Sequence, residues 1–89
     1  MRSVTTERFR RSYAYLPENV QNQTRKAYKL WKKNPNHPSL QFKPIHDTEP
    51  VYSVRVSLSY RALGLKQAGV FIWFWIGSHA DYDKMIASL

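Results

Sequence analysis

The sequence has 89 residues, a length that accommodates one small domain spanning residues 1–89. Its 43% hydrophobic and 15% aromatic content is typical of a folded chain and not of a disordered one. The absence of Cys excludes disulfides and thiolate metal sites, and no apolar run is long enough to span a bilayer. Because the first residues also lack an apolar signal core, we expect a soluble cytoplasmic protein with no membrane partner.

The net charge of +8 is confined to the first half of the chain. Residues 1–43 carry ten Lys and Arg side chains against two acidic ones, whereas residues 44–89 carry four of each kind. This segregation favours a polyanion or an acidic protein as the binding partner. A solvated helix surface is the alternative explanation for the same charges.

The predicted elements begin with a brief edge strand over residues 1–5 and a helix that starts after it. Phe9, Tyr13 and Leu16 recur at helical spacing, and Thr5 or Thr6 is the expected N-cap. Pro17 ends this helix and opens a second one, which extends to about residue 33. With so short a connection, the two helices must form a hairpin.

The second helix has one apolar stripe and a strongly basic remainder. The stripe consists of Val20, Thr24, Ala27 and Trp31. The segment from Asn34 to Pro38 then breaks the helix.

Strand patterns follow. Residues 40–45 predict a strand that Pro44 keeps short or at an edge, and residues 51–58 alternate between two faces. Tight turns connect this strand to residues 60–66 and then to residues 70–76, which predicts an antiparallel meander. The alternation puts Tyr52, Val54, Val56 and Leu58 on one face and Ser53, Arg55 and Ser57 on the other.

The strand over residues 70–76 has seven consecutive apolar residues and is expected to be buried on both faces. Strict alternation would put Phe71, Trp73 and Trp75 on one face and Ile76 on the other. Ser78 is the expected N-cap of a final helix over residues 80–88. The fold class is therefore α+β, an N-terminal helical hairpin packed on a 3–4-stranded antiparallel sheet with a short C-terminal helix. Since only one hairpin covers this sheet, we also expect exposed Trp or Phe surface for a protein partner.

No metal site, Gly-rich phosphate loop or nucleophile elbow is visible, and the three His residues lie far apart in the sequence. The candidate catalytic residues are Arg55, Arg61 and His79. Arg can hold a phosphate and stabilise charge that develops on it, and His can exchange a proton near neutral pH. These groups suffice to cleave RNA through its own 2′-hydroxyl, without a metal.

Structural alternatives apply to each candidate. His79 could act as a capping group, and the arginines could pair with acidic side chains (Asp47, Glu49 or Asp83). Tyr82 could be a core contact of the last helix.

Several short motifs, in this order and spacing, resemble the RelE/ParE superfamily, the toxins of type II toxin–antitoxin systems. The resemblance covers roughly residues 4–86 and is nearest to the RelE, YafQ and HigB-like branches. The motifs are Asn-Pro-Asn-His-Pro-Ser-Leu after the second helix, Tyr-Ser-Val-Arg-Val and Tyr-Arg in the meander, and Trp-Ile-Gly-Ser-His-Ala-Asp-Tyr at its end.

The resemblance implies a metal-independent, cofactor-free endoribonuclease that enters the ribosomal A site, cuts mRNA and is inactivated by a cognate antitoxin. By position, Arg61 would bind the phosphate and its transition state, Arg55 would be the basic residue of the preceding strand, and His79 would be the C-terminal catalytic residue. Tyr82 or Asp83 would contribute secondarily. Contacts to mRNA and rRNA would come from Lys26, Lys29, Lys32, Lys33, Lys43 and Tyr82.

Ser53 departs from the pattern, because a Lys is expected there. The alternative function is that of a ParE-like DNA gyrase inhibitor, or of a catalytically inactive homologue that acts by binding. The presence of Arg61 and His79 favours the nuclease.

Overall fold

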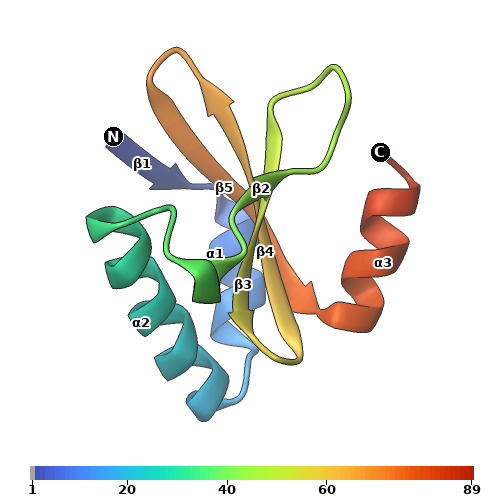
Figure 1. Ribbon diagram of the computed structural model, residues 1–89. Coiled ribbons are helices and arrows are strands. Elements are labelled where there is room, and N and C mark those ends of the chain that lie inside the picture. Colours follow the sequence, from blue (N-terminus) through green and yellow to red (C-terminus); the bar gives the residue numbers. More distant parts are fainter. Residues whose placement is uncertain (1) are drawn as a thin grey trace.

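A five-stranded sheet of order β1-β5-β4-β3-β2 is the centre of the computed structural model, which describes residues 2–89. The strands are β1 (Arg2–Thr5), β2 (Lys43–Pro44), β3 (Val51–Ser57), β4 (Tyr60–Gln67) and β5 (Val70–Ser78). Figure 1 shows α2 (Glu18–Lys33) on one side of this sheet and α3 (His79–Ala87) on the other. The predicted α+β class is confirmed, with more strands than expected: β1 joins the antiparallel meander by pairing in parallel with β5. Met1 lies outside the described residues.

The predicted caps and breaks of the helices are confirmed. Thr6 caps α1 (Glu7–Ala14), since its Oγ1 accepts a hydrogen bond from the Phe9 amide at 3.1 Å. Pro17 stands directly before α2, and Ser78 caps α3 by accepting from the Asp81 amide at 3.2 Å. Local side-chain chemistry therefore sets where all three helices begin.

The segment between α2 and β3 differs from the prediction. Residues 40–45 were expected to form a strand, yet Leu40 ends a 3₁₀ turn, η1 (Pro38–Leu40), and only residues 43–44 pair with β3. Gln41 adopts a left-handed conformation with φ of 45°, which redirects the chain before any strand can start. Leu40 is nevertheless buried. The apolar pattern therefore predicted its burial correctly, although the predicted strand is wrong.

A register shift in β5 changes which side chains share a face. Leu63 pairs with Trp75 and Gly64 pairs with Trp73, so Phe74 is an extra residue in β5. Beyond this bulge the alternation is reversed, and Ile76 joins Phe71 and Trp73 in the core beneath the helices. The prediction that Trp75 shares their face is therefore wrong.

The core lies between the sheet and the two N-terminal helices, on a side that we call the hairpin face, with Val54, Ala62, Phe71, Trp73 and Ile76. Trp31 from α2 lies in the middle of this core, with its ring centroid 5.1 Å from those of Phe71 and Trp73. Gly64 is required here, because a Cβ at this position would lie 1.8 Å from Cε1 of Phe71. Aromatic packing of this kind is a major source of stability in a small chain.

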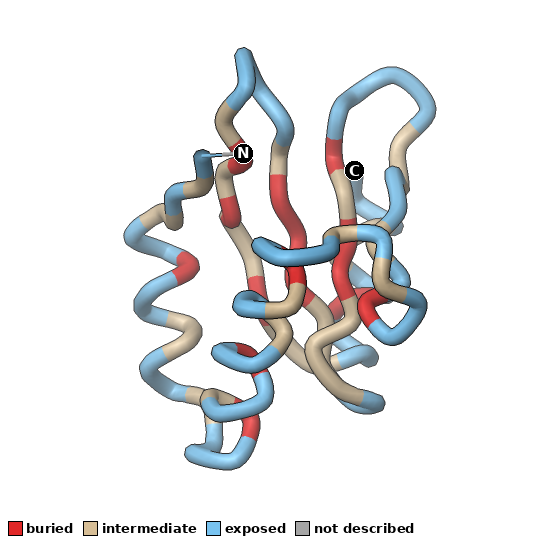
Figure 2. Tube along the Cα trace, turned by 60° about the vertical axis from the view of Figure 1, so that its left-hand side comes forward, coloured by how far each residue is buried: buried red, intermediate tan, exposed pale blue. Residues whose placement is uncertain are grey.

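The opposite side, which we call the α3 face, carries Ser53, Arg55, Arg61, Leu63 and Trp75, as the strand pairing shows. Leu63 is fully buried there, whereas Trp75 is half-buried, and Figure 2 shows buried positions alternating with partly exposed ones along the strands. The expectation of a β5 buried on both faces thus holds for the hairpin face and only partly for this one.

Apolar exposure differs from the prediction as well. Among residues 2–89, the exposed large apolar side chains are Val4, Tyr15, Tyr28, Leu58 and Leu89, so no Trp or Phe is exposed. Leu58, expected on the apolar face of its strand, lies in the β3–β4 turn and is 77% exposed. Over the described part of the chain, no helix has the length and apolarity needed to cross a membrane.

Candidate functional site

Two of the candidate residues are direct neighbours on the α3 face. Arg55 of β3 and Arg61 of β4 are paired across the antiparallel ladder, and Gly77 of β5 is the partner of Arg61 on its other side. Both arginines are partly buried, and among residues 2–89 neither lies within ion-pairing distance of a carboxylate. The proposed alternative, in which these arginines form structural ion pairs, is therefore not what the structure contains.

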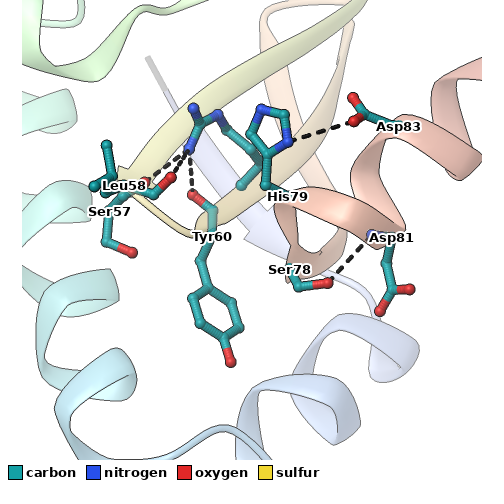
Figure 3. Close-up of polar contacts among 8 residues, drawn as sticks. Ser57, Leu58, Tyr60, Ser78, His79, Asp81 and Asp83 are labelled. Atoms are coloured by element: carbon teal, nitrogen blue, oxygen red, sulfur yellow. Dashed lines mark hydrogen bonds and ion pairs between the residues drawn. The ribbon is translucent and has the colours of Figure 1, made fainter.

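The β3–β4 turn holds the guanidinium of Arg61. Its Nη1 donates to the carbonyl oxygens of Ser57, Leu58 and Tyr60 at 2.7, 3.5 and 3.0 Å, as the dashed lines in Figure 3 indicate. One nitrogen is thus engaged by the turn, which fixes the direction of the side chain. A positioned, partly buried guanidinium of this kind is suited to bind a phosphate oxygen.

The guanidinium of Arg61 is partly buried and lies near a second positive charge. Burial of the guanidinium and, as the second cause, the charge of Arg55 lower the pKa of Arg61 below its ordinary value. Tyr82 and Asp83 act in the opposite direction on this pKa, so the first turns of α3 lie close enough to Arg61 to affect it. An anion placed between the two arginines would relieve their mutual repulsion.

The same turn ties His79 to the arginines. The His79 amide donates to the Ser59 carbonyl at 2.7 Å, and the preceding residue, Ser78, pairs with Tyr60. His79 is the first residue of α3, so the cap formed by Ser78 also sets its orientation. The structure therefore brings the three candidate catalytic residues to one corner of the α3 face.

The side chain of His79 faces Asp83 one helical turn later, as Figure 3 shows. Its Nδ1 lies 3.4 Å from Oδ2 of Asp83, and half of the side chain is exposed. A carboxylate at Nδ1 orients the ring and leaves Nε2 free to exchange a proton with a substrate. An imidazole held in this way can serve as a general acid or base.

Tyr82 is buried, with 8% exposure, and its ring centroid lies 5.8 Å from that of His79. This fits the alternative of a core contact better than a surface contact with RNA. Its ring packs beside the imidazole in a tilted arrangement.

The predicted RNA-contacting lysines do not form one group. Lys26 and Lys29 of α2 line two different grooves, and Lys26 shares its groove with Arg55. Lys32 and Lys33 are exposed in the last turn of α2, on the hairpin side of the sheet. Lys43 pairs with Ser53 and so belongs to the same sheet face as the arginines.

Sequence reasoning missed several contributors. The carbonyls of the β3–β4 turn could not be recognised as a guanidinium site without the register of the hairpin. Trp75 borders the site as well, because its ring occupies the space over Gly77, where a Cβ would lie 2.7 Å from Cζ2 of the indole. The pairing of His79 with Asp83 was readable from their i,i+4 spacing.

The other two histidines have structural roles. Nδ1 of His37 accepts the Ser39 amide at the start of η1, and Nδ1 of His46 accepts the Glu49 amide at 2.9 Å within its loop. Within residues 2–89, no three His, Asp or Glu side chains gather closely enough to hold a metal ion.

The sequence was compared with models of known protein families and with curated protein sequences. Residues 18–84 match the model of a family described as "ParE-like toxin domain", which covers most of the chain. No curated protein sequence matches.

Solved structures share the fold at low sequence identity. The crystal structure of YafQ from E. coli strain BL21(DE3) has a TM-score of 0.74 and 11% identity over 92% of this chain and 98% of its own. The RelB-RelE antitoxin-toxin complex from Methanococcus jannaschii has a TM-score of 0.73 and 11% identity, over 92% of this chain and 96% of its own. A YoeB/ParE toxin from Agrobacterium tumefaciens has a TM-score of 0.70 and 14% identity, over 89% of this chain and 99% of its own. These similarities show a common arrangement of helices and strands.

Proposed function

The chain belongs to the family of ParE-like toxin domains, and from this premise we propose that it is the toxin of a type II toxin–antitoxin system that cuts mRNA on the ribosome. In this proposal it acts in the cytoplasm without a metal and inhibits translation. Its partners are the ribosome with its mRNA and a cognate antitoxin.

The observation that carries the proposal is the pair of unneutralised arginines next to an oriented histidine. Two like charges placed opposite each other on adjacent strands destabilise a fold, so a structural role does not account for them. A phosphodiester bound between them would supply the missing negative charge. His79 is then placed at the edge of that phosphate site, with its Nε2 unobstructed by Asp83.

The proposed reaction uses the RNA's own 2′-hydroxyl as the nucleophile. Its oxygen bonds to the neighbouring phosphorus, the bond from phosphorus to the 5′-oxygen breaks, and a 2′,3′-cyclic phosphate remains on the upstream fragment. His79 donates a proton to the departing 5′-oxygen, and the proton of the 2′-hydroxyl passes to solvent. Arg55 and Arg61 stabilise the additional charge on the phosphoryl oxygens, a contribution that is often the largest in such reactions.

Structures with the same fold support an antitoxin as a partner. Several of the similar solved structures are complexes, among them the RelB-RelE complex from Methanococcus jannaschii and the DinJ-YafQ complex from E. coli. The net charge of +8 suits either an acidic antitoxin or ribosomal RNA.

The test is cleavage of mRNA on programmed ribosomes, with the new ends mapped by primer extension. We expect His79→Ala and Arg61→Ala to reduce cleavage by about 10²-fold or more. His46→Ala is the matched control, because it removes an imidazole that organises a loop away from the site. If both site variants cleave like the parent, the assignment of the site is wrong.

A gyrase assay gives the contrasting outcome. Inhibition of supercoiling by the pure protein, with no cleavage of ribosome-bound mRNA, would replace the nuclease by a ParE-like activity. Neither activity in the parent protein would leave a binding role and overturn the proposed reaction.

A further inference from the structure

A groove between α1 and α2 lies on the hairpin face, and we call it the hairpin groove. Its volume is about 430 Å³, within the range of small-ligand sites, and it is partly open to solvent. Both helices, the end of β1 and the sheet contribute its lining residues: Thr5, Phe9, Arg10, Tyr13, Thr24, Arg25, Ala27, Tyr28, Lys29, Trp31, Val54, Val56, Ala62 and Trp73.

Two side chains of α2 connect this helix to its neighbours around the groove. The Tyr28 hydroxyl is hydrogen-bonded to the Ser3 hydroxyl of β1 at 2.6 Å. Nη1 of Arg25 donates to the Tyr13 hydroxyl of α1 at 2.5 Å. These contacts hold α2 at a set distance from both α1 and β1, so the groove is formed before any ligand binds and little ordering is required of the protein.

The rim of the groove carries positive charges only, since its charged lining residues are Arg10, Arg25 and Lys29. A second lining residue locates the tip of each arginine. Nη1 of Arg10 donates to the carbonyl and hydroxyl oxygens of Thr5 at 2.6 and 3.0 Å, as Arg25 does to Tyr13. Within residues 2–89, no carboxylate lies within ion-pairing distance of these three cations. The rim therefore suits an anion.

The inner walls of the groove are formed by buried apolar side chains, among them Phe9, Trp31, Trp73 and Val54. Of the large apolar side chains exposed within residues 2–89, only Tyr28 borders the groove. The apolar surface therefore ends at the rim, whereas a stable protein interface covers about 800 Å² on each partner. A compact ligand fits this groove better than a protein partner does.

We propose that the hairpin groove binds a small amphipathic acid, a free molecule with an apolar body and one carboxylate. The apolar body lies against Trp73 and Val54, and the carboxylate lies at Arg10 and Arg25. Burial of the apolar body supplies affinity, and the arginines select an acid over a neutral molecule of the same shape. This inference goes beyond the proposed function and does not depend on it, because the candidate catalytic residues lie on the opposite face of the sheet.

The test compares decanoate with decanol, which has the same chain without the charge. Calorimetric titration of the purified protein gives both affinities. Trp fluorescence of a Trp75→Phe variant locates the ligand, because the two remaining tryptophans, Trp31 and Trp73, both line the groove. We expect both ligands to perturb this fluorescence, and decanol to bind at least tenfold more weakly than decanoate, the effect of losing one charge-assisted hydrogen bond.

Variants of the groove separate its charge from its shape. Arg10→Gln and Arg25→Gln should each weaken decanoate binding about tenfold and leave decanol binding unchanged. Arg8→Gln is the control, because it removes the same charge from an exposed position of α1 outside the groove. Ala27→Leu narrows the groove without changing the charge, so it should weaken the binding of both ligands. Circular dichroism checks that each variant is folded.

Three results would overturn the inference. The first is the absence of saturable decanoate binding. The second is equal affinity for decanoate and decanol, or a loss in Arg8→Gln as large as in Arg25→Gln, since either would indicate unspecific attraction. The third is an acidic amphipathic peptide that binds in place of decanoate and loses affinity in Ala27→Leu, which would make the groove a protein-docking surface. Cleavage of mRNA by the parent is measured separately, so the proposed function would survive each of them.

Discussion

The hairpin face of the sheet is filled with rings that contact one another, whereas the α3 face carries two arginines opposite each other that have no carboxylate partner within residues 2–89. On the hairpin face, Trp31, Phe71 and Trp73 lie within 5.1 Å of one another, centroid to centroid, and all are buried. On the α3 face, burial and, as the second cause, the charge of Arg55 lower the pKa of Arg61, and both arginines are partly exposed. Both faces belong to the same strands, so the difference lies in the side chains.

This difference separates stability from function. Side chains that pack closely against one another serve the fold, whereas like charges placed opposite each other mark a place where a bound anion would complete the arrangement. We therefore expect changes on the hairpin face to unfold the protein and changes on the α3 face to abolish cleavage at little cost in stability.

The largest effect is expected from Phe71→Ala. The ring is fully buried, so its loss should lower the free energy of unfolding by about 3–5 kcal/mol, a large part of the total for a chain of this size. Urea denaturation followed by Trp fluorescence would measure it. Trp75→Ala, on the half-exposed side of the same strand, should cost clearly less; an equal cost would erase the distinction between the faces.

Gly64→Val is the next largest. The new Cβ would occupy the space of the Phe71 ring, which must move, and overpacking of this kind costs about 1–3 kcal/mol. Thermal unfolding of the variant would show the loss. Gly69→Ala places a Cβ in open space at a turn, so it isolates the backbone cost of its φ of +80° from any steric clash. If Gly64→Val were as stable as the parent, the described packing of Phe71 would be wrong.

The N-caps of α1 and α3, one a threonine and one a serine, allow a matched comparison with a smaller expected effect on stability. Thr6→Ala and Ser78→Ala each remove one N-cap hydrogen bond, and each should cost about 1 kcal/mol in chemical denaturation. Only Ser78→Ala should also reduce mRNA cleavage, because it loosens the start of α3, where His79 is held. Equal loss of cleavage in both variants would indicate that stability alone limits activity.

The sequence predicted most of this comparison because caps, prolines and helical periodicity act locally. Thr6, Pro17 and Ser78 each determine a helix start through contacts within a few residues. Val20, Thr24 and Trp31 were identified as the buried stripe of α2 from spacing alone. The grouping of Arg55, Arg61 and His79 followed from expecting neighbouring strands in a meander.

What could not be predicted depends on register. The bulge opposite Leu63 and Gly64 moves Trp75 to the site and Ile76 to the core, and no local pattern marks it, since all residues of β5 before Gly77 are apolar. Gln41 in a left-handed conformation likewise ended the expected strand over residues 40–45. The hydrogen bonds from Arg61 to the β3–β4 turn could not be predicted either, because a prediction requires knowing which carbonyl oxygens converge in space.

The smallest effect on stability belongs to Arg55, and it is the most direct test of the central claim that the α3 face is maintained for function. Arg55→Gln removes the repulsion with Arg61, so thermal unfolding measured beside ribosomal mRNA cleavage should show two opposite changes. We predict that the free energy of unfolding rises by about 0.2–1 kcal/mol while cleavage falls at least tenfold. A variant that loses stability, or that cleaves as well as the parent, would contradict the account.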